Sequence, residues 1–108
     1  MGKNMVKHVT SSELEELIAK GEPVFCDFWA VWCGPCRMLG PVFEELSDKY
    51  DGKATFVKVD VDSEEEAARK YGITSIPNVI AFKNGAQVDN SLGFVPQAAL
   101  EAFVEKNL

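Results

Sequence analysis

The stretch Val24-Phe25-Cys26-Asp27-Phe28-Trp29-Ala30-Val31-Trp32-Cys33-Gly34-Pro35-Cys36 joins an apolar run to a pair of cysteines. The run Val24–Trp29 is apolar except for one aspartate, and this predicts a buried strand. Between Met38 and Tyr50, apolar residues recur at helical spacing, which predicts an amphipathic helix. The cysteines Cys33 and Cys36 are therefore expected where a strand passes into the N-terminus of a helix.

The position of these two cysteines indicates redox chemistry. A helix N-terminus carries unpaired N–H groups and the positive end of the helix dipole, and both stabilise an anion. A cysteine there is stabilised as the thiolate, which is the form that attacks disulfides. We expect Cys33 to be the nucleophile and Cys36, one turn further along, to be the less exposed resolving thiol. Their spacing also allows a disulfide to close without unwinding the helix.

Composition restricts the other function classes. The 108 residues suit a single domain over residues 1–108, and the 46% of apolar residues can form a core. The formal net charge of −6 argues against nucleic acid and anionic membrane surfaces as partners. No apolar run approaches the roughly 18 residues that span a bilayer, and no secretory signal is recognisable. These features favour a cytoplasmic protein.

A metal site is the main alternative use of the cysteines. Cys26, Cys33, Cys36 and His8 could supply four zinc ligands. Structural zinc sites usually have a second closely spaced ligand pair, which is missing here, and Cys26 lies inside the apolar strand. We therefore expect no metal and no other cofactor, with the Cys33–Cys36 disulfide itself as the redox-active group. Stoichiometric zinc in a redox-inactive purified protein would favour the metal site.

Strand and helix patterns alternate along the rest of the chain. Further strands are expected at Met5–Val9, Ala54–Val61, Asn78–Phe82 and Ala86–Ser91. Further helices are expected after capping boxes at Ser12/Glu15 and Ser63/Glu66, ending at Gly21 and Gly72, and from Pro96 to Leu108. Asn84-Gly85 predicts a hairpin turn between the last two strands.

The resulting order, β-α-β-α-β-α-β-β-α, determines the expected fold. Early strands that alternate with helices are expected to be parallel and joined by right-handed crossovers, whereas the final hairpin is antiparallel. We therefore expect an α/β protein, specifically a three-layer α/β/α sandwich in which a mixed central sheet lies between the helices.

The residues around the cysteines resemble the thioredoxin family, and the resemblance covers almost the whole chain. The segment from Asp27 to Cys36 is similar to the active-site strand and loop of that family. Further matching segments are Val57-Lys58-Val59-Asp60, Tyr71-Gly72-Ile73, Ser75-Ile76-Pro77, Phe82-Lys83-Asn84-Gly85 and Gly93. The resemblance implies the thioredoxin fold and a general protein-disulfide reductase that acts by dithiol–disulfide exchange. It also implies disulfide-containing protein substrates and a separate thioredoxin reductase as the source of electrons.

The resemblance assigns roles to two charged residues. Asp27 matches the family's aspartate that accepts the proton of the resolving cysteine, and Lys58 matches a lysine near that aspartate. A carboxyl group inside an apolar strand is desolvated, which raises its pKa. The alternative is a buried Asp27–Lys58 ion pair with a purely structural role. We favour the catalytic role because buried titrating groups cluster at active sites.

Substrate binding is expected on the residues that surround the dithiol. Ile76-Pro77 is similar to the family's cis-proline element, which faces the dithiol and whose neighbouring backbone can pair with an extended substrate. Trp32 is expected at the rim of the site, and Gly93 can let the backbone of a partner approach closely. A flat apolar docking patch is expected from Val31, Trp32, Ile73, Ile76 and Pro77.

Gly34 and Pro35, which we also count among the substrate-binding residues, carry no charge. A cationic residue between the cysteines would stabilise the thiolate further and make the disulfide more oxidising. The pair therefore predicts a reductant of low potential rather than an oxidase or an isomerase. We also expect the protein to be a monomer. A thioredoxin-fold binding subunit of a larger assembly is the alternative, although a scaffold has no need of two thiols. Val31 and Asn78 depart from the usual family residues and leave partner choice open.

Overall fold

The computed structural model describes residues 6–108, and in this range the chain forms five strands and four helices. The strands are β1 (Lys7–His8), β2 (Val24–Trp29), β3 (Thr55–Asp60), β4 (Asn78–Lys83) and β5 (Ala86–Leu92). The helices are α1 (Ser11–Ala19), α2 (Gly34–Lys49), α3 (Glu65–Lys70) and α4 (Gln97–Lys106). The predicted order of elements is confirmed. The first strand was expected to begin at Met5, which lies outside the described residues.

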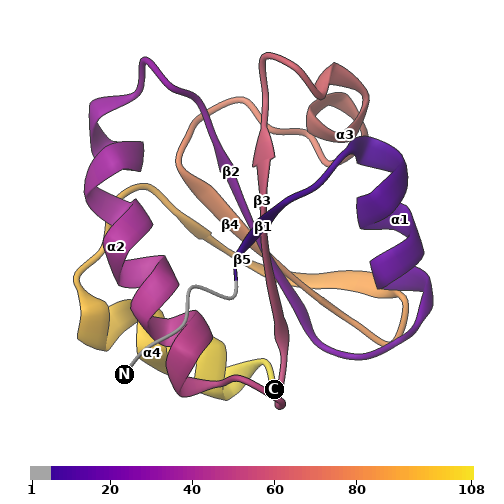
Figure 1. The fold of residues 1–108 in the computed structure, drawn as a ribbon, viewed down its shortest axis with the longest axis vertical. Coiled ribbons are helices and arrows are strands. Elements are labelled where there is room, and N and C mark those ends of the chain that lie inside the picture. Colours follow the sequence, from indigo (N-terminus) through magenta and orange to yellow (C-terminus); the bar gives the residue numbers. More distant parts are fainter. Residues whose placement is uncertain (1–5) are drawn as a thin grey trace.

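The strands form one mixed sheet in the order β1-β3-β2-β4-β5 (Figure 1). β3 is parallel to both β1 and β2, as expected for strands joined through helices. β4 is antiparallel to β2, and β5 is antiparallel to β4. Because β2 and β3 are parallel neighbours, the loops that follow them leave the same edge of the sheet.

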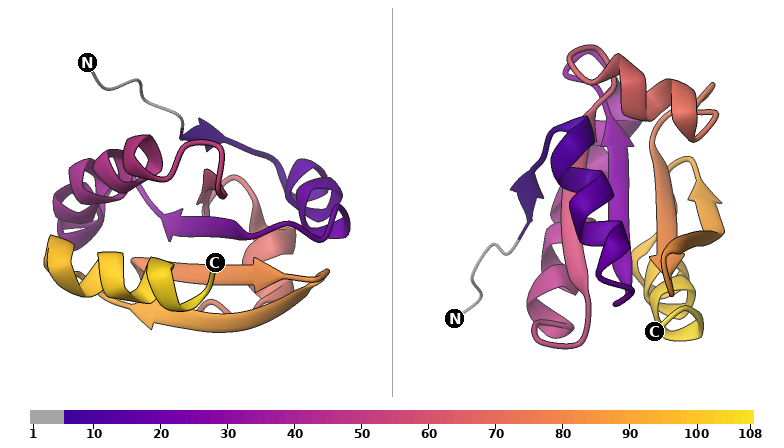
Figure 2. Two further views of the ribbon diagram at one scale, coloured as in Figure 1. Left: turned by 90° about the horizontal axis from the view of Figure 1, so that it is seen from below. Right: turned by 90° about the vertical axis from the view of Figure 1, so that its right-hand side faces the viewer.

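Helices cover both faces of this sheet, with α1 and α3 on one face and α2 and α4 on the other (Figures 1 and 2). Along β2, Cys26 and Phe28 pack in the core beneath α1 and α3, while Phe25 packs with α2 and α4. Because side chains alternate along a strand, Asp27 faces the α2 side and Cys26 faces the opposite side. The expected three-layer α/β/α sandwich is confirmed.

α2 begins at Gly34, before the predicted start at Met38. Pro35 occupies the first turn, where its fixed φ suits a helix start and its missing N–H is not needed. Apolar periodicity begins only where the helix contacts the core, and for that reason it indicates a start later than Gly34. Cys33 is the N-cap residue, so both cysteines lie at the very start of the helix. They are therefore closer to the positive end of the helix dipole than a helix start at Met38 would place them.

The capping box of α1 consists of Thr10 and Glu13, not of Ser12 and Glu15. The Glu13 N–H donates to the Thr10 hydroxyl at 3.1 Å, and the Thr10 N–H donates to the Glu13 carboxylate at 2.9 Å. Both residue pairs satisfy the local pattern. The helix uses the earlier pair because the chain turns into α1 directly after Val9 has entered the core.

The second predicted capping box, Ser63 with Glu66, does not form, and among the described residues no side chain makes a capping hydrogen bond to α3. The carboxylate of the N-cap residue Glu64 instead accepts the backbone N–H of Ser11 at 2.7 Å and its hydroxyl at 3.1 Å. This tertiary contact ties α3 to the start of α1. A local sequence pattern carries no information about such a contact, and for that reason the prediction was wrong.

Candidate active site

The two cysteines of the predicted site form a disulfide, with their Cα atoms 5.2 Å apart. The backbone N–H of Cys36 donates to the Sγ of Cys33 at 3.2 Å. The loop that leads to them is closed by a turn in which the Cys33 N–H donates to the Ala30 carbonyl at 3.2 Å. A backbone donor of the first helical turn therefore points at the Cys33 sulfur. This contact stabilises a thiolate when the disulfide is reduced.

Both cysteines are largely covered by neighbouring residues. Cys33 is 5% exposed and Cys36 is 2% exposed, so Cys33 is less accessible than the sequence suggested, although the order of exposure is as expected. The exposed part of the site is the preceding loop, where Val31 is 63% exposed and Trp32 is 66% exposed. Ile73, from the predicted apolar patch, is half-buried. An incoming molecule can therefore contact this loop next to the dithiol.

Two charged side chains hold this exposed loop. The Trp32 Nε1 donates to the Oδ2 of Asp62 at 2.8 Å, and the guanidinium of Arg37 donates to the carbonyl of Val31 at 3.0 Å. Neither Asp62 nor Arg37 was among the predicted site residues. Asp62 closely follows the end of β3, which is parallel to β2. Its place beside the loop that follows β2 could therefore have been inferred once the two strands were assigned as neighbours.

The peptide bond between Ile76 and Pro77 is cis, as the resemblance implied. The carbonyl oxygen of Ile76 lies 3.9 Å from the Cys33 Sγ, and the carbonyl of Pro77 accepts the N–H of Gly93 at 2.7 Å. The structure thus brings Ile76, Pro77 and Gly93 together beside the dithiol. The Pro77 ring is buried, so it adds little to the predicted apolar patch. The adjacent Ser75 is exposed, and its backbone borders the site.

Asp27 is fully buried in β2 and pairs in register with Lys58 of β3. Neither of its carboxylate oxygens has a hydrogen-bond partner among the described residues. Burial raises the pKa of Asp27 to about 7, and the positive charge of Lys58 opposes this rise only in part. Within residues 6–108 the two side chains form no direct ion pair. Among the described residues, the structure therefore shows a buried carboxyl group with no direct ion pair to Lys58, although the charge of Lys58 still acts on it.

The ammonium group of Lys58 lies over the ring of Trp29, with its Nζ 4.6 Å from the ring centroid. A cation over the face of an indole is attracted to it, so this contact holds the Lys58 head group near Asp27 without bonding the two charges. Trp29 is half-buried and packs against Cys33 and Cys36. Trp29 thus packs beside the dithiol.

The remaining candidate features lie away from the dithiol or do not form. Between residues 6 and 108, no group of three or more His, Cys, Asp or Glu side chains is arranged to hold a metal ion. Cys26 is completely buried, and burial together with the nearby Asp27 charge raises the pKa of its thiol well above the ordinary value. In the same range, no helix combines the length and the apolar character that crossing a bilayer requires.

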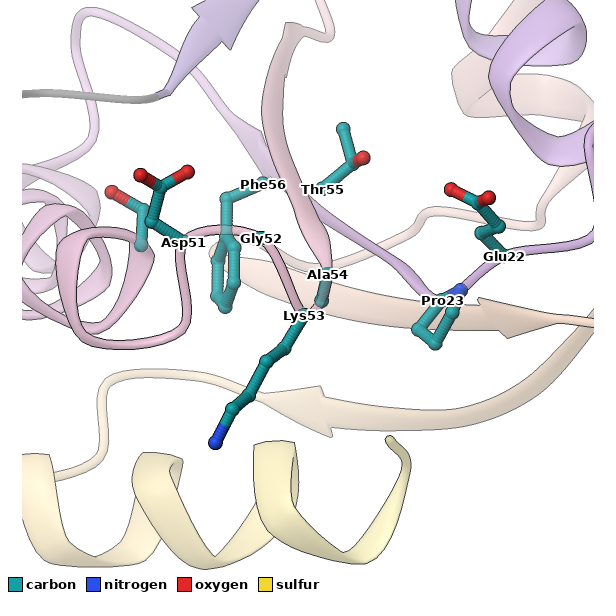
Figure 3. Close-up of a pocket in the computed structure, with 9 residues that line it drawn as sticks. Glu22, Pro23, Asp51, Gly52, Lys53, Ala54, Thr55 and Phe56 are labelled. Carbon is teal, nitrogen blue, oxygen red and sulfur yellow. The ribbon is translucent and has the colours of Figure 1, made fainter.

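A cavity of about 360 Å³ lies at the end of β2 and β3 that is opposite to the dithiol. It is found between Glu22 and Asp51, with Phe56 in its lining (Figure 3). It contains no cysteine. The cavity is thus separated from the dithiol by the length of the two strands, and the chemistry of the site does not involve it.

A redox-active cysteine pair at a strand-to-helix junction, on a mixed sheet with helices on both faces, defines a thiol–disulfide oxidoreductase of the α/β class. The sequence model of the thioredoxin family matches residues 5–106. The chain belongs to the thioredoxin family, and it acts as a thioredoxin-type protein-disulfide oxidoreductase by dithiol–disulfide exchange.

Individual relatives agree with this assignment. The chain is 48% identical over 104 residues to "Thioredoxin M-type, chloroplastic" of Pisum sativum, an alignment that covers 95% of this chain and 60% of the pea protein. It is 47% identical over 100 residues to the thioredoxin of Staphylococcus saprophyticus, which covers 93% of this chain and 95% of that protein. The crystal structure of Malassezia sympodialis thioredoxin superposes with a TM-score of 0.91 at 35% identity, covering 99% of this chain and 94% of that one.

Proposed function

We propose that the protein is a general protein-disulfide reductase that is itself re-reduced by a thioredoxin reductase. The environment of Cys33 is the observation that supports this most strongly. Its sulfur lies at the N-cap of α2, accepts a backbone N–H at 3.2 Å, and lies 3.9 Å from the Ile76 carbonyl. The sulfur is thus stabilised as an anion next to a backbone segment that can hold an extended polypeptide.

In the proposed cycle, the Cys33 thiolate attacks one sulfur of a substrate disulfide, and the other sulfur leaves as a thiolate that takes up a proton. Cys36 then loses its proton and attacks the Cys33 sulfur, which displaces the second substrate sulfur. Two electrons pass from the dithiol to the substrate, which is released as two thiols. The protein is left with the Cys33–Cys36 disulfide, which the reductase must reduce.

Asp27 is proposed to accept the proton that Cys36 loses. With a pKa of about 7, this carboxyl group is partly ionised at neutral pH, which suits a group that must take up and release a proton. Its unpartnered oxygens are available as acceptors. Lys58 is proposed to tune Asp27, because its positive charge keeps the pKa of that carboxyl group from rising further.

The substrate is proposed to bind as an extended segment whose backbone pairs with the backbone at Ser75 and Ile76, in the manner of strand addition. The exposure of Ser75 and the short distance from Ile76 to the Cys33 sulfur support this path. The residues proposed to contact the substrate are Trp32, Gly34, Pro35, Ile76, Pro77 and Gly93.

The absence of charge at Gly34 and Pro35 supports a reductant of low potential. A reductant of protein disulfides works in a reducing compartment, so we propose the cytoplasm as its location. The chloroplast is the alternative, because the pea relative is named for it. We further propose that the active unit is a monomer with a single domain over residues 1–108.

Turnover of insulin disulfides with dithiothreitol as the electron donor tests this proposal. We expect Cys33→Ser to abolish turnover. In a separate reaction, Cys36→Ser is reduced, freed of dithiothreitol and mixed with insulin, and it should stop after one attack with a mixed disulfide that mass spectrometry detects. Cys26→Ala is the matched control and should retain turnover, because Cys26 faces the opposite side of the sheet. Undiminished activity of Cys33→Ser would contradict the proposal and favour the scaffold alternative.

A further inference from the structure

Trp32 is 66% exposed, yet its ring is held by a specific contact. The indole N–H, which can only donate, bonds to the Oδ2 of Asp62 at 2.8 Å. A carboxylate acceptor makes this hydrogen bond stronger than a neutral acceptor would. Because two thirds of the residue faces solvent, packing does little to select one orientation of the ring. The hydrogen bond to Asp62 is therefore the main constraint on where the indole lies.

Asp62 is itself presented by an ordered part of the chain. Its backbone N–H donates to the Oδ1 of Asp60 at 2.8 Å, and the preceding Val61 N–H donates to the carbonyl of Trp29 at 2.9 Å. Asp60 is the last residue of β3 and pairs in register with Trp29 at the end of β2. The sheet thus fixes the start of the β3–α3 loop, and this loop in turn fixes the side chain that holds Trp32.

We infer that Asp62 is a positioning residue for disulfide exchange, which holds the Trp32 indole beside Cys33 in the orientation that a protein substrate contacts. The inference rests on the proposed function, because it requires Trp32 to contact the substrate. Without the hydrogen bond, the exposed ring can spread over roughly three χ1 wells, so the competent orientation falls to about a third of the population. Apparent affinity falls with the competent fraction, and kcat/KM for a protein disulfide should therefore drop about threefold, mainly through KM.

Insulin reduction by Asp62→Ala, Asp62→Asn, Trp32→Phe and the double variant Asp62→Ala/Trp32→Phe tests the inference. Asp62→Ala should lower kcat/KM about threefold. Asp62→Asn should retain most of the wild-type value, because its side-chain oxygen can still accept the indole N–H. Trp32→Phe has no N–H to donate, so removal of Asp62 in that background should cause no further loss.

Two additional readouts separate positioning from general effects. The alkylation rate of Cys33 in the reduced protein should be the same in wild type and Asp62→Ala, whereas the Trp32 indole N–H resonance in NMR spectra should shift. Asp51→Ala removes an equal charge beside the distant cavity of Figure 3 and should leave insulin turnover unchanged.

The inference is overturned if Asp62→Ala matches wild type, or if its loss is as large in the Trp32→Phe background. It is equally overturned if Asp62→Asn fails to restore turnover or if Asp51→Ala reproduces the loss. A failure of the proposed function would look different, because Cys33→Ser would then reduce insulin as well as wild type does.

Discussion

Asp27 keeps its proton to a much higher pH than an exposed aspartate, because burial raises its pKa to about 7. In the unfolded chain the same group titrates near its ordinary value of about 4. At a pH between these two pKa values, Asp27 of the folded protein holds a proton that the unfolded chain has already released. The free energy of unfolding therefore falls as the pH rises through this window. Above it the fold holds a charged carboxylate that has no hydrogen-bond partner within residues 6–108.

We predict that Asp27→Asn raises the free energy of unfolding at about pH 8 by up to about 4 kcal/mol, which corresponds to a shift from 3.8 to about 7. The gain should shrink as the pH falls and vanish below about pH 4, where both states of the wild type are protonated. Urea unfolding at a series of pH values measures this. Asp51→Asn, at an exposed position, is the control and should show no such window. A gain that does not change with pH would show that burial of the charge is not its cause.

For individual residues, the sequence was sufficient to predict a role in the site where the signal is local. The spacing of Cys33 and Cys36 and the single charge inside the run Val24–Trp29 were visible without any tertiary information. Asp62 and Arg37 were missed because their roles depend on which loops meet in space. The low exposure of Cys33 was missed for the same reason, since Ile76 approaches it from a distant part of the chain.

At the scale of elements, the β4–β5 hairpin turns at Asn84 and Gly85, as the sequence predicted. Both residues adopt left-handed backbone angles, with φ of 57° and 83°. This is the pattern of a two-residue type I′ turn, whose twist matches that of the flanking strands. The turn sets where β5 starts, and β5 then runs back to Gly93 beside the active site.

We predict that Gly85→Ala lowers the free energy of unfolding by about 1 kcal/mol, because an L-residue with a side chain resists a left-handed conformation. Apart from its two chain neighbours, no part of residues 6–108 lies within 4 Å of the added Cβ, so the effect is one of backbone conformation and not of a clash. Gly40→Ala is the contrasting control in the interior of α2, where the nearest atom to the new Cβ is the Lys58 Nζ at 3.8 Å. It should raise the free energy of unfolding by about 0.5–1 kcal/mol. If urea unfolding showed the free energy of unfolding changing in the same direction in both variants, the left-handed backbone at Gly85 would not be the cause of the loss.

The type of each element was predictable from periodicity, whereas several of the ends were not. A capping pattern is short and occurs by chance, so Ser12/Glu15 and Thr10/Glu13 were equally plausible from sequence. At α3 the predicted box failed because the N-cap residue Glu64 bonds to Ser11, in a different helix. Ends that depend on tertiary contacts of this kind lie beyond local sequence patterns.

At the scale of the whole molecule, the sheet gathers the site from four separate segments. The loop after β2 carries the dithiol and the loop after β3 carries Asp62. The cis-proline segment precedes β4, and Gly93 follows β5. The strand order β1-β3-β2-β4-β5 and the strand directions place all four segments at the same end of the sheet (Figure 1). The sequence predicted a mixed sheet between helices but not this strand order, because the pairing of distant strands is decided by the packing of the complete core.

We propose that this arrangement keeps Cys33 anionic in the reduced protein. An ordinary thiol, with a pKa of about 8.5, is only a few per cent thiolate at neutral pH. Stabilisation of the thiolate at the helix N-cap therefore raises the thiolate fraction and with it the reactivity.

The most direct test is the rate at which iodoacetamide alkylates Cys33 at neutral pH in a reduced Cys36→Ser variant, with the modified residue identified by mass spectrometry. We predict alkylation about five- to tenfold faster in the folded protein than in the same protein unfolded in denaturant. A folded rate no faster than the unfolded one would contradict the claim.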